Sequence, residues 1–398
     1  MWAIHAVITG EQTLGFRRFQ LRERLKPTEV LVKVDRTIIS AGTELANFTG
    51  LDPDTRDRGK WCCYPWVPGY GGIGRVVEVG NAVKGLAAGD RVYGIYNHAT
   101  HAVVDTAARL CVPVPASLDS TTAAFVRMGN VAITAMRRAD ATLGDPVAII
   151  GLGLVGNLAG QFFARAGQRV IGIDPAANRR KLAETVGFEA TLDPTGLEPE
   201  ELLGRVQALV TPAAQIGKAP ARPSAPASSP RVVVDAVGDS RLVEQAVRLA
   251  ARNGQVIMLG TPRAPYVADM TPTLNDAHRR GIDIKGALEW NVPMLKRQAG
   301  GGPSTEGNAE LILRMLARDE LRVGALCTHV LPPAALNDAY LGLLHQKEAY
   351  MGVVLDWEQH PAPDPTLPDA TGIWPRIPAH QRPIEEKTPD GARTTSGR

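Results

Sequence analysis

Apolar and polar residues alternate over short stretches in the first third of the chain. The runs 30–35, 74–80 and 90–94 show this alternation and are separated by glycine and proline. A period of two that is broken by turn residues is typical of half-buried antiparallel strands. We therefore predict a compact antiparallel β domain over residues 1–124.

Beyond residue 124 the pattern changes to apolar runs that alternate with helical segments. Strands are predicted at 147–151, 169–174, 189–193, 231–237, 254–260 and 282–288. Helices are predicted between them at 154–167, 178–187, 200–210 and 240–252. Six strands in such alternation indicate a doubly wound parallel sheet, so the fold class is α/β, with this second domain over residues 125–290.

The rest of the chain contains one more predicted helix, at 307–319, and two strand-like runs, at 325–331 and 351–356. We expect residues 291–357 to return to the first domain. Two segments are rich in proline and poor in apolar residues, the insertion 211–230 and the tail 358–398. Such composition favours disorder. The alternative for the tail, whose anchor-like residues are Ile373, Trp374 and Ile377, is that it lies across a neighbouring subunit.

The glycine-rich turn from Gly151 to Gly156, with the sequence GLGLVG, is the most informative local pattern. A strand precedes it, a helix follows, and the next strand ends in Asp174. Glycines in such a turn let the backbone and the helix N-terminus approach a pyrophosphate, and the acid accepts hydrogen bonds from a ribose. We therefore predict NAD(H) binding. The expected cofactor contacts are Gly151, Gly153, Leu154, Val155, Gly156, Asp174, Arg179 and Thr134.

Composition excludes several other classes of protein. The 398 residues carry a net charge of only +3, and no basic stretch interleaves with aromatic residues, so we do not expect nucleic-acid binding. The four cysteines have no metal-binding spacing, which favours reduced thiols in the cytoplasm. The most membrane-like run, 147–164, is interrupted by glycines and belongs to the glycine-rich turn, so no membrane association is predicted.

Four sequence runs, taken in order, resemble the medium-chain dehydrogenase/reductase superfamily. They are ISAGTE at 39–44, VPGYGGIG at 67–74, AGDRV at 88–92 and the segment 143–156. The resemblance spans residues 25–357, and within the superfamily it is strongest to zinc-less relatives of alcohol and polyol dehydrogenases, including bacteriochlorophyllide hydroxyethyl dehydrogenases. It implies a GroES-like β domain, a Rossmann domain, a small-molecule substrate, and a homodimer or homotetramer.

The three positions that hold the catalytic zinc in the family's alcohol dehydrogenases are occupied here by Ala41, Tyr70 and Arg127. The family's proton-relay histidine corresponds to Ala46, and the lobe that binds a structural zinc is missing. Zinc needs three or four nitrogen, sulfur or oxygen ligands. The resemblance therefore implies a member that works without zinc.

Without a metal, another group must polarise the substrate oxygen. Because Tyr70 and Arg127 fall on two ligand positions, we expect them to be neighbours, with the guanidinium lowering the pKa of the phenol. Tyr70 is then a general acid/base, Arg127 stabilises the oxyanion and Thr43 hydrogen-bonds the substrate. Glu44 either orients Thr43 or caps a helix. His98 and His101 are alternative bases or simply surface residues.

Three functions are consistent with these residues. The first is a zinc-independent, NAD(H)-dependent alcohol dehydrogenase or ketone reductase that acts on a secondary alcohol or ketone, such as a polyol, a sugar-like molecule or a natural-product intermediate. The second is a C=C reductase of enones or quinones, and the third is a nucleotide-binding scaffold without catalysis. Trp61 and Trp290, which we expect near the cleft, favour a ring-bearing substrate.

Overall fold

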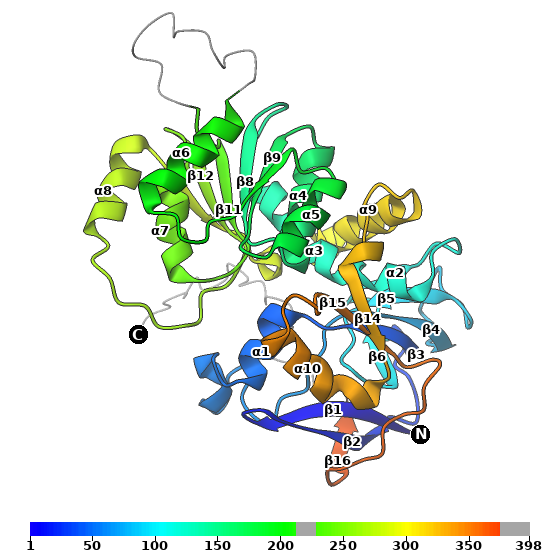
Figure 1. The fold of residues 1–398 in the computed structure, drawn as a ribbon. Coiled ribbons are helices and arrows are strands. Elements are labelled where there is room, and N and C mark those ends of the chain that lie inside the picture. The colour runs from blue at the N-terminus through cyan, green and yellow to red at the C-terminus, as the bar shows by residue number, and fades with distance from the viewer. Residues whose placement is uncertain (212–227, 375–398) are drawn as a thin grey trace, which may run out of the picture.

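The computed structural model describes residues 1–211 and 228–374, and these form two lobes, each built around a β-sheet (Figure 1). The predicted fold class, a GroES-like β domain with a Rossmann domain, is confirmed. The first lobe begins with three long strands and two short helices before the sheet continues. These elements are β1 (Trp2–Gly10), β2 (Thr13–Leu21), β3 (Glu29–Ile38), α1 (Ala41–Phe48), η1 (Pro53–Arg56), β4 (Gly72–Val79), β5 (Arg91–Gly94), β6 (His101–Asp105) and β7 (Cys111–Pro113).

The sheet of the first lobe is completed by strands from the far end of the chain. Its order is β14-β15-β3-β4-β5-β7, with β6 also paired to β3. The strands β14 (Cys327–Leu331) and β15 (Gly352–Asp356) are joined by η6 (Pro333–Ala335) and α10 (Leu336–His345). Buried Tyr340 of α10 packs its ring against Phe48 of α1, with the ring centroids 5.0 Å apart.

The second lobe is a six-stranded parallel sheet of order β10-β9-β8-β11-β12-β13. Its elements are β8 (Pro146–Ile150), α4 (Leu154–Arg165), β9 (Arg169–Ile173), α5 (Ala177–Thr185), β10 (Ala190–Leu192), α6 (Pro199–Val210), β11 (Val232–Asp235), α7 (Ser240–Leu249), β12 (Gln255–Met258), α8 (Thr271–Arg280) and β13 (Asp283–Gly286). The order reverses between β8 and β11. Ligands of such sheets bind at the carboxyl ends of the strands at this switch point.

The predicted strands and helices of this lobe are confirmed, but the pattern of apolar residues did not reveal α8. The reason is its composition, because only Thr273 and Ala277 are buried along its length. Helices α2 (Ser120–Ala124), α3 (Val126–Arg138) and α9 (Thr305–Ala317) lie between the lobes. Short 3-10 turns complete the connections: η3 (Glu289–Asn291), η4 (Lys296–Gln298) and η5 (Gly324–Leu326).

The predicted disorder of the tail is wrong for its described part, residues 358–374. The backbone N–H groups of Thr366 and Leu367 both donate to the carbonyl of Phe16. Beyond them, β16 (Ala370–Trp374) pairs in parallel with β2 and completes a three-stranded sheet, β1-β2-β16. The tail therefore adds a strand to its own chain. Ile377 and most of the insertion 211–230 lie outside the described residues.

Among the described residues, no helix combines the length and the apolar character needed to cross a membrane.

Candidate active site

The glycine-rich turn lies at the carboxyl end of β8, where the sheet order reverses. Gly151 has a φ of +87°, and a Cβ there would lie 2.4 Å from Val237 Cγ2. A Cβ on Gly156 would lie 1.9 Å from the carbonyl oxygen of Gly151. Both positions therefore require glycine, and the turn brings the first residues of α4, Leu154 and Val155, directly behind Gly153. This open backbone at a helix N-terminus fits a pyrophosphate.

Asp174 follows the last residue of β9, and two backbone groups hold its carboxylate in place. One oxygen accepts from the N–H of Leu152 and the other from the N–H of Ala176, both at 2.8 Å. Arg179 Nη1 lies 3.8 Å from the same carboxylate, and its Nη2 donates to the carbonyl of Lys347 in the first lobe. The acid thus lies beside the glycine-rich turn, where a ribose would be held, and these residues fit a dinucleotide.

Thr134 does not belong to this group, and its expected contact with the cofactor is wrong. Thr134 lies on α3 and its side chain is buried. Its hydroxyl oxygen lies 2.6 Å from the carbonyl oxygen of Val131 and 2.9 Å from that of Ala287. The hydroxyl therefore joins α3 to the segment after β13.

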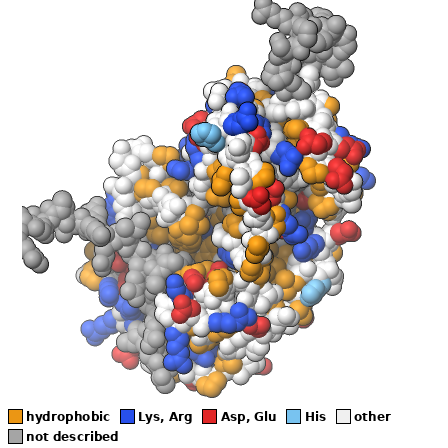
Figure 2. Space-filling model, turned by 90° about the vertical axis from the view of Figure 1, so that its left-hand side faces the viewer, with side chains coloured by type: hydrophobic (Ala, Val, Ile, Leu, Met, Phe, Trp, Pro, Cys, Tyr) orange, Lys and Arg blue, Asp and Glu red, His pale blue; other side chains and the backbone are white. Residues whose placement is uncertain are grey.

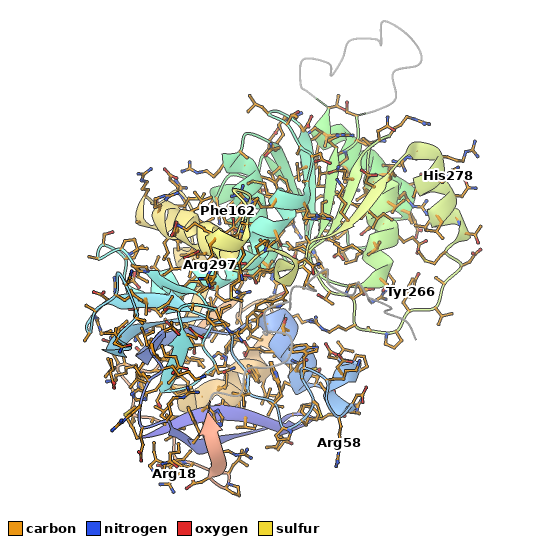
Figure 3. All side chains as sticks on the ribbon, turned by 180° about the vertical axis from the view of Figure 1, so that it is seen from behind. Arg18, Arg58, Phe162, Tyr266, His278 and Arg297 are labelled. Carbon is orange, nitrogen blue, oxygen red and sulfur yellow. The ribbon has the colours of Figure 1, made fainter. Side chains whose placement is uncertain are left out.

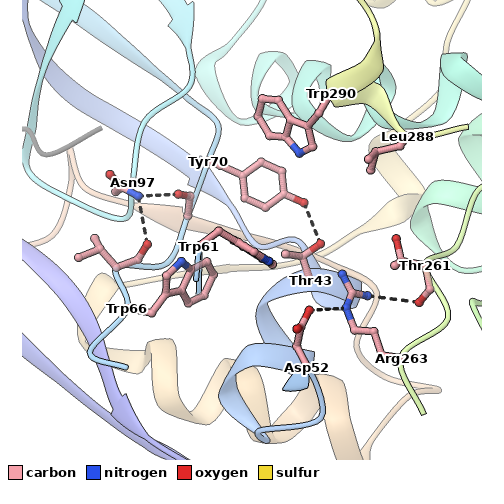
Figure 4. Close-up of a pocket in the computed structure, with 12 residues that line it drawn as sticks. Thr43, Asp52, Trp61, Trp66, Tyr70, Asn97, Thr261, Arg263, Leu288 and Trp290 are labelled. Atoms are coloured by element: carbon pink, nitrogen blue, oxygen red, sulfur yellow. Dashed lines mark hydrogen bonds and ion pairs between the residues drawn. The ribbon is translucent and has the colours of Figure 1, made fainter. Parts of the chain in front are cut away.

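A cavity of about 310 Å³ lies between the lobes. Figure 2 shows hydrophobic side chains in a hollow between the two halves of the face it presents. The walls combine aromatic rings with a few polar groups, and they come from both lobes (Figure 4). The lining residues are Thr43, Asp52, Trp61, Trp66, Val67, Gly69, Tyr70, Asn97, Thr261, Arg263, Leu288 and Trp290.

Two hydroxyl groups at one wall of this cavity, those of Tyr70 and Thr43, lie close to a third, that of Ser40. Tyr70 OH is hydrogen-bonded to Ser40 Oγ and lies 3.4 Å from Thr43 Oγ1. Ser40 is the N-cap of α1 and Thr43 lies in its first turn, so the start of one helix positions both groups. Tyr70 follows Gly69, which has a φ of +86° and contacts the backbone of His98 so closely that a Cβ would lie 2.4 Å from its nitrogen.

Arg127 is the neighbour of Tyr70, but its position changes the predicted role. Its guanidinium carbon lies 4.7 Å from the centre of the Tyr70 ring and 5.5 Å from that of Trp290, so it faces the rings and not the phenol oxygen. It also makes two hydrogen bonds to the carboxylate of Glu289, one of them at 2.9 Å, and both side chains are buried. The guanidinium is therefore paired with a carboxylate and stacked against the rings, so it is not free to act on the phenol oxygen as expected.

Gly71 makes room for this arginine. A Cβ at Gly71 would lie 2.3 Å from Arg127 Cγ. The side chain of Arg127 thus occupies the space that a side chain at position 71 would need.

Glu44 and His98 are not in the cavity, because both are completely buried and bonded to each other. His98 Nε2 lies 2.9 Å from Glu44 Oε2, and its Nδ1 lies 2.7 Å from Thr37 Oγ1. Glu44 also accepts from the backbone N–H of Ser40 and from the hydroxyl of Tyr340. Of the two expected roles, Glu44 therefore caps the helix, which begins at Ala41. Neither residue reaches a substrate in the cavity.

His101 lies on β6, opposite Lys33 of β3, and does not line the cavity. Burial, with a smaller contribution from Lys33, lowers its pKa to about 4. Of the two roles expected for His101, a base or a surface residue, its position outside the cavity does not support the base, and its side chain is half-buried.

The residues at the family's zinc positions do not fit a zinc ion. Ala41 has no ligand atom, Tyr70 OH is bonded to Ser40, and a buried guanidinium occupies the third position. A cation at this point repels a metal ion. Among the described residues, no group of three or more His, Cys, Asp or Glu side chains has a metal-binding arrangement.

Ser40, Glu289, Asp52 and Arg263 were missed by the sequence analysis. Ser40 directly precedes Ala41, and Glu289 directly precedes Trp290, so both adjoin residues that were singled out. Neither Asp52 nor Arg263 lies in a recognisable motif. Their relation becomes visible only when the two lobes come together.

Two family models match consecutive parts of the chain. Residues 26–136 match the alcohol dehydrogenase GroES-like domain, and residues 155–296 match the zinc-binding dehydrogenase domain. The chain belongs to the medium-chain dehydrogenase/reductase family. It is therefore an oxidoreductase of this family, although the residues at its metal positions differ from those that bind zinc.

Individual members of the family are similar over most of the chain. The 2-desacetyl-2-hydroxyethyl bacteriochlorophyllide A dehydrogenase of Cereibacter sphaeroides is 25% identical over 369 residues, which are 88% of this chain and 97% of the relative. The sorbitol dehydrogenase of Ovis aries is also 25% identical, over 84% of this chain and 91% of the relative. Among solved structures, a protein described as a zinc-binding dehydrogenase from Sinorhizobium meliloti 1021, bound to NADP, has a TM-score of 0.67 at 20% identity and covers 89% of this chain and 99% of its own.

Proposed function

We propose that this protein transfers a hydride between NAD(H) and the secondary alcohol or ketone of a small molecule, without zinc. The observation that carries this proposal is a cluster of three hydroxyls: those of Tyr70 and Thr43 line a cavity that the Rossmann lobe completes with Leu288 and Trp290, and that of Ser40 is bonded to Tyr70 OH. A hydroxyl cluster there places proton donors where the family holds its metal. The curated relatives include dehydrogenases named for a hydroxyethyl group and for sorbitol, which supports chemistry at a C–O bond.

The proposed proton path uses only side chains of this cluster. In the direction of ketone reduction, Tyr70 O–H donates its proton to the carbonyl oxygen as the bond to carbon becomes single. Thr43 donates a hydrogen bond to the same oxygen, and Ser40 donates one to the phenolate that remains. The nicotinamide of a dinucleotide whose pyrophosphate is held at the glycine-rich turn would supply the hydride. The substrate thereby gains one hydride and one proton, which completes its conversion to an alcohol.

We propose NAD(H) as the cofactor because the Asp174 carboxylate is fixed beside the turn by two backbone N–H groups. A 2′-phosphate next to it would bring two anions together. Arg179, which lies 3.8 Å from this carboxylate, is the residue that would favour NADP(H) if it turned toward a phosphate. The oligomeric state, a homodimer or homotetramer, and the cytoplasmic location stay predictions.

Tyr70→Phe tests the proposal, since it keeps the ring on Arg127 and removes only the hydroxyl. We expect kcat for a secondary alcohol to fall by ~10²–10⁴, the usual contribution of general acid/base catalysis, while the Kd for NADH stays unchanged. Tyr64→Phe is the matched control, because the Tyr64 hydroxyl donates to the carbonyl of Asn47 and does not line the cavity. It should leave kcat within about twofold.

Near-normal kcat in Tyr70→Phe would contradict the acid/base role. Turnover of enones but of no alcohol or ketone by the wild-type protein would instead support C=C reduction. NADH binding without turnover of any of these compounds would leave a nucleotide-binding scaffold.

A further inference from the structure

Two charged side chains from opposite lobes meet at the wall of the cavity. Arg263 Nε lies 3.1 Å from Asp52 Oδ2, and the side chains are only 15% and 12% exposed. Figure 4 shows the pair on the other side of Thr43 from the Tyr70 ring. The proton path proposed above uses neither group, so their presence in the cavity needs a separate explanation.

Asp52 is held in place by its own lobe. It is the N-cap of η1, where its side chain accepts from the N–H of Asp54, and the thiol of Cys62 also bonds to it. Its carboxylate is therefore a fixed acceptor, whether or not Arg263 is near.

Arg263 reaches this carboxylate from a loop that is otherwise exposed. Within residues 261–270, which follow β12 and precede α8, Arg263 alone is half-buried and the other nine residues are exposed. Its Nε donates a hydrogen bond to the carboxylate of Asp52, and its Nη1 lies 3.5 Å from the carbonyl oxygen of Thr261. Within the described residues, Nη2 makes no hydrogen bond that would compete with a ligand. The loop thus places a guanidinium with free donors at the cavity.

The chemistry of this pair selects among ligands. Together the two groups carry no net charge, and they offer both donors and an acceptor. A hydroxyl, which donates and accepts, satisfies both at once. A carboxylate or phosphate would approach Asp52, and an ammonium group would approach Arg263, so either ion meets a like charge.

The remaining walls favour a ring. Trp61 and Trp66 meet edge to face with their centroids 5.8 Å apart, and Tyr70 and Trp290 form a second aromatic pair at 6.3 Å. Aromatic faces carry partial negative charge and therefore attract the C–H groups of a saturated ring. The cavity thus joins apolar faces to one neutral, hydrogen-bonding subsite.

We propose that Asp52 and Arg263 form a specificity-determining subsite that binds a neutral hydroxyl group remote from the reacting carbon of a ring-bearing polyol. This inference rests on the proposed function, because it takes the reacting C–O group to lie at Tyr70 and Thr43. It assigns the substrate class as a hydroxylated ring without ionised groups.

The test compares three ring alcohols that share one reacting group: cyclohexanol, trans-1,4-cyclohexanediol and 4-hydroxycyclohexanecarboxylate. With the wild-type protein and NAD+, kcat/KM for the diol should exceed that for cyclohexanol by about 10- to 100-fold, the value of a hydrogen bond to a charged group. The carboxylate should be the poorest of the three. In Arg263→Met the ratio of diol to cyclohexanol should fall to about 1–3.

Asp52→Asn should lower the same ratio and, because it frees Arg263, should raise kcat/KM for the carboxylate by about tenfold or more. Arg58→Met is the matched control, because Arg58 is an exposed arginine on the first lobe that does not line the cavity (Figure 3). It should leave all three values unchanged. Since Arg263→Met leaves the cap of η1 intact, it keeps the test valid if Asp52→Asn disturbs folding.

Binding of the diol and of cyclohexanol to the protein with NAD+, followed by tryptophan fluorescence, separates this proposal from the proposed function. If no alcohol is oxidised but the diol binds tighter and Arg263→Met removes the difference, the proposed function fails and the subsite stands. If alcohols are oxidised but the ratio of kcat/KM for the diol to kcat/KM for cyclohexanol is the same in the wild type and in both variants, the subsite is refuted. A wild-type preference for the carboxylate would refute it as well.

Discussion

Removing Glu289 should destabilise the protein strongly, because it leaves the cation of Arg127 buried without a counter-charge. Arg127 is 1% exposed and Glu289 is 4% exposed. The guanidinium has aromatic rings on its faces, those of Tyr70 and Trp290, and the carboxylate of Glu289 at its edge. Water therefore cannot easily replace the lost partner.

The size of the effect follows from this burial. Breaking a buried ion pair by removing one partner costs about 3–5 kcal/mol. Contacts of the cation with the rings, about 0.5–2 kcal/mol, are present both in the wild type and in Glu289→Leu, so they do not reduce this cost. At about 2–4 °C per kcal/mol for a domain of this size, Tm should fall by roughly 6–20 °C. The double variant Arg127→Met with Glu289→Leu removes both charges and should recover most of the loss.

The assay is a double-mutant cycle of the free energy of unfolding in urea, with Tm as a second measurement. The matched control is the exposed pair of Arg248 and Glu200, whose nitrogen and oxygen lie 2.9 Å apart with side chains 41% and 76% exposed. Its coupling should be below about 1 kcal/mol. The reasoning is refuted if Glu289→Leu is no more destabilising than Glu200→Leu, or if the double variant is as unstable as Glu289→Leu alone.

Three further predictions follow from single sites. The purified protein should hold no stoichiometric zinc by elemental analysis and should keep its activity in EDTA; one zinc per chain would overturn the interpretation of Tyr70 and Arg127. NADH should bind more tightly than NADPH in a titration, and Asp174→Ser should narrow the difference, whereas equal wild-type affinities would show that Arg179 receives the 2′-phosphate. Burial, and less strongly Arg17, lowers the pKa of His5 to about 3. The unfolded chain therefore binds the proton first, stability should fall as pH drops from 6.5 toward 3, and His5→Phe should flatten this slope in pH-dependent urea unfolding.

The fold was predictable because its strongest signals are local. A single βαβ unit contains the apolar run before Gly151, the three glycines and the acid at the end of the next strand. Each of these residue types has a steric or electrostatic role in binding a dinucleotide, and the role can be recognised from the sequence alone. The position of α8 was not predictable, since a helix with two buried residues leaves almost no apolar periodicity. The tail was missed for a different reason. A strand at 370–374 is stabilised by the edge of β2, which lies about 350 residues earlier in the sequence.

In the candidate site, too, features with a local sequence signal could be predicted, and features that depend on contacts between distant residues could not. The location of Tyr70 and Thr43 in the cavity wall could be predicted, because each lies in a recognisable motif, and their catalytic roles stay predictions. The burial of Glu44 and His98 could not, because it depends on Tyr340 and Thr37, which belong to other elements of the first lobe. The sequence also does not show whether a charged side chain is paired with a counter-charge in the fold. The sequence predicts Arg127 as an activator of Tyr70, but the carboxylate of Glu289, 162 residues later, pairs with the edge of its guanidinium.

The changes at the metal positions depend on one another physically. Arg127 fits beside Tyr70 only because position 71 is glycine, and its charge is tolerated only because Glu289 lies opposite. Introducing Cys at position 41 and His at position 70, both residue types that bind zinc, would therefore not create a metal site, since the guanidinium would still lie in it. A variant designed to bind zinc would require replacing Arg127 and Glu289 together, for the same reason that removing either one alone is costly. We therefore propose that an internally neutral ion pair stands where the family's metal would lie, and that the hydroxyls of Tyr70, Thr43 and Ser40 move the proton.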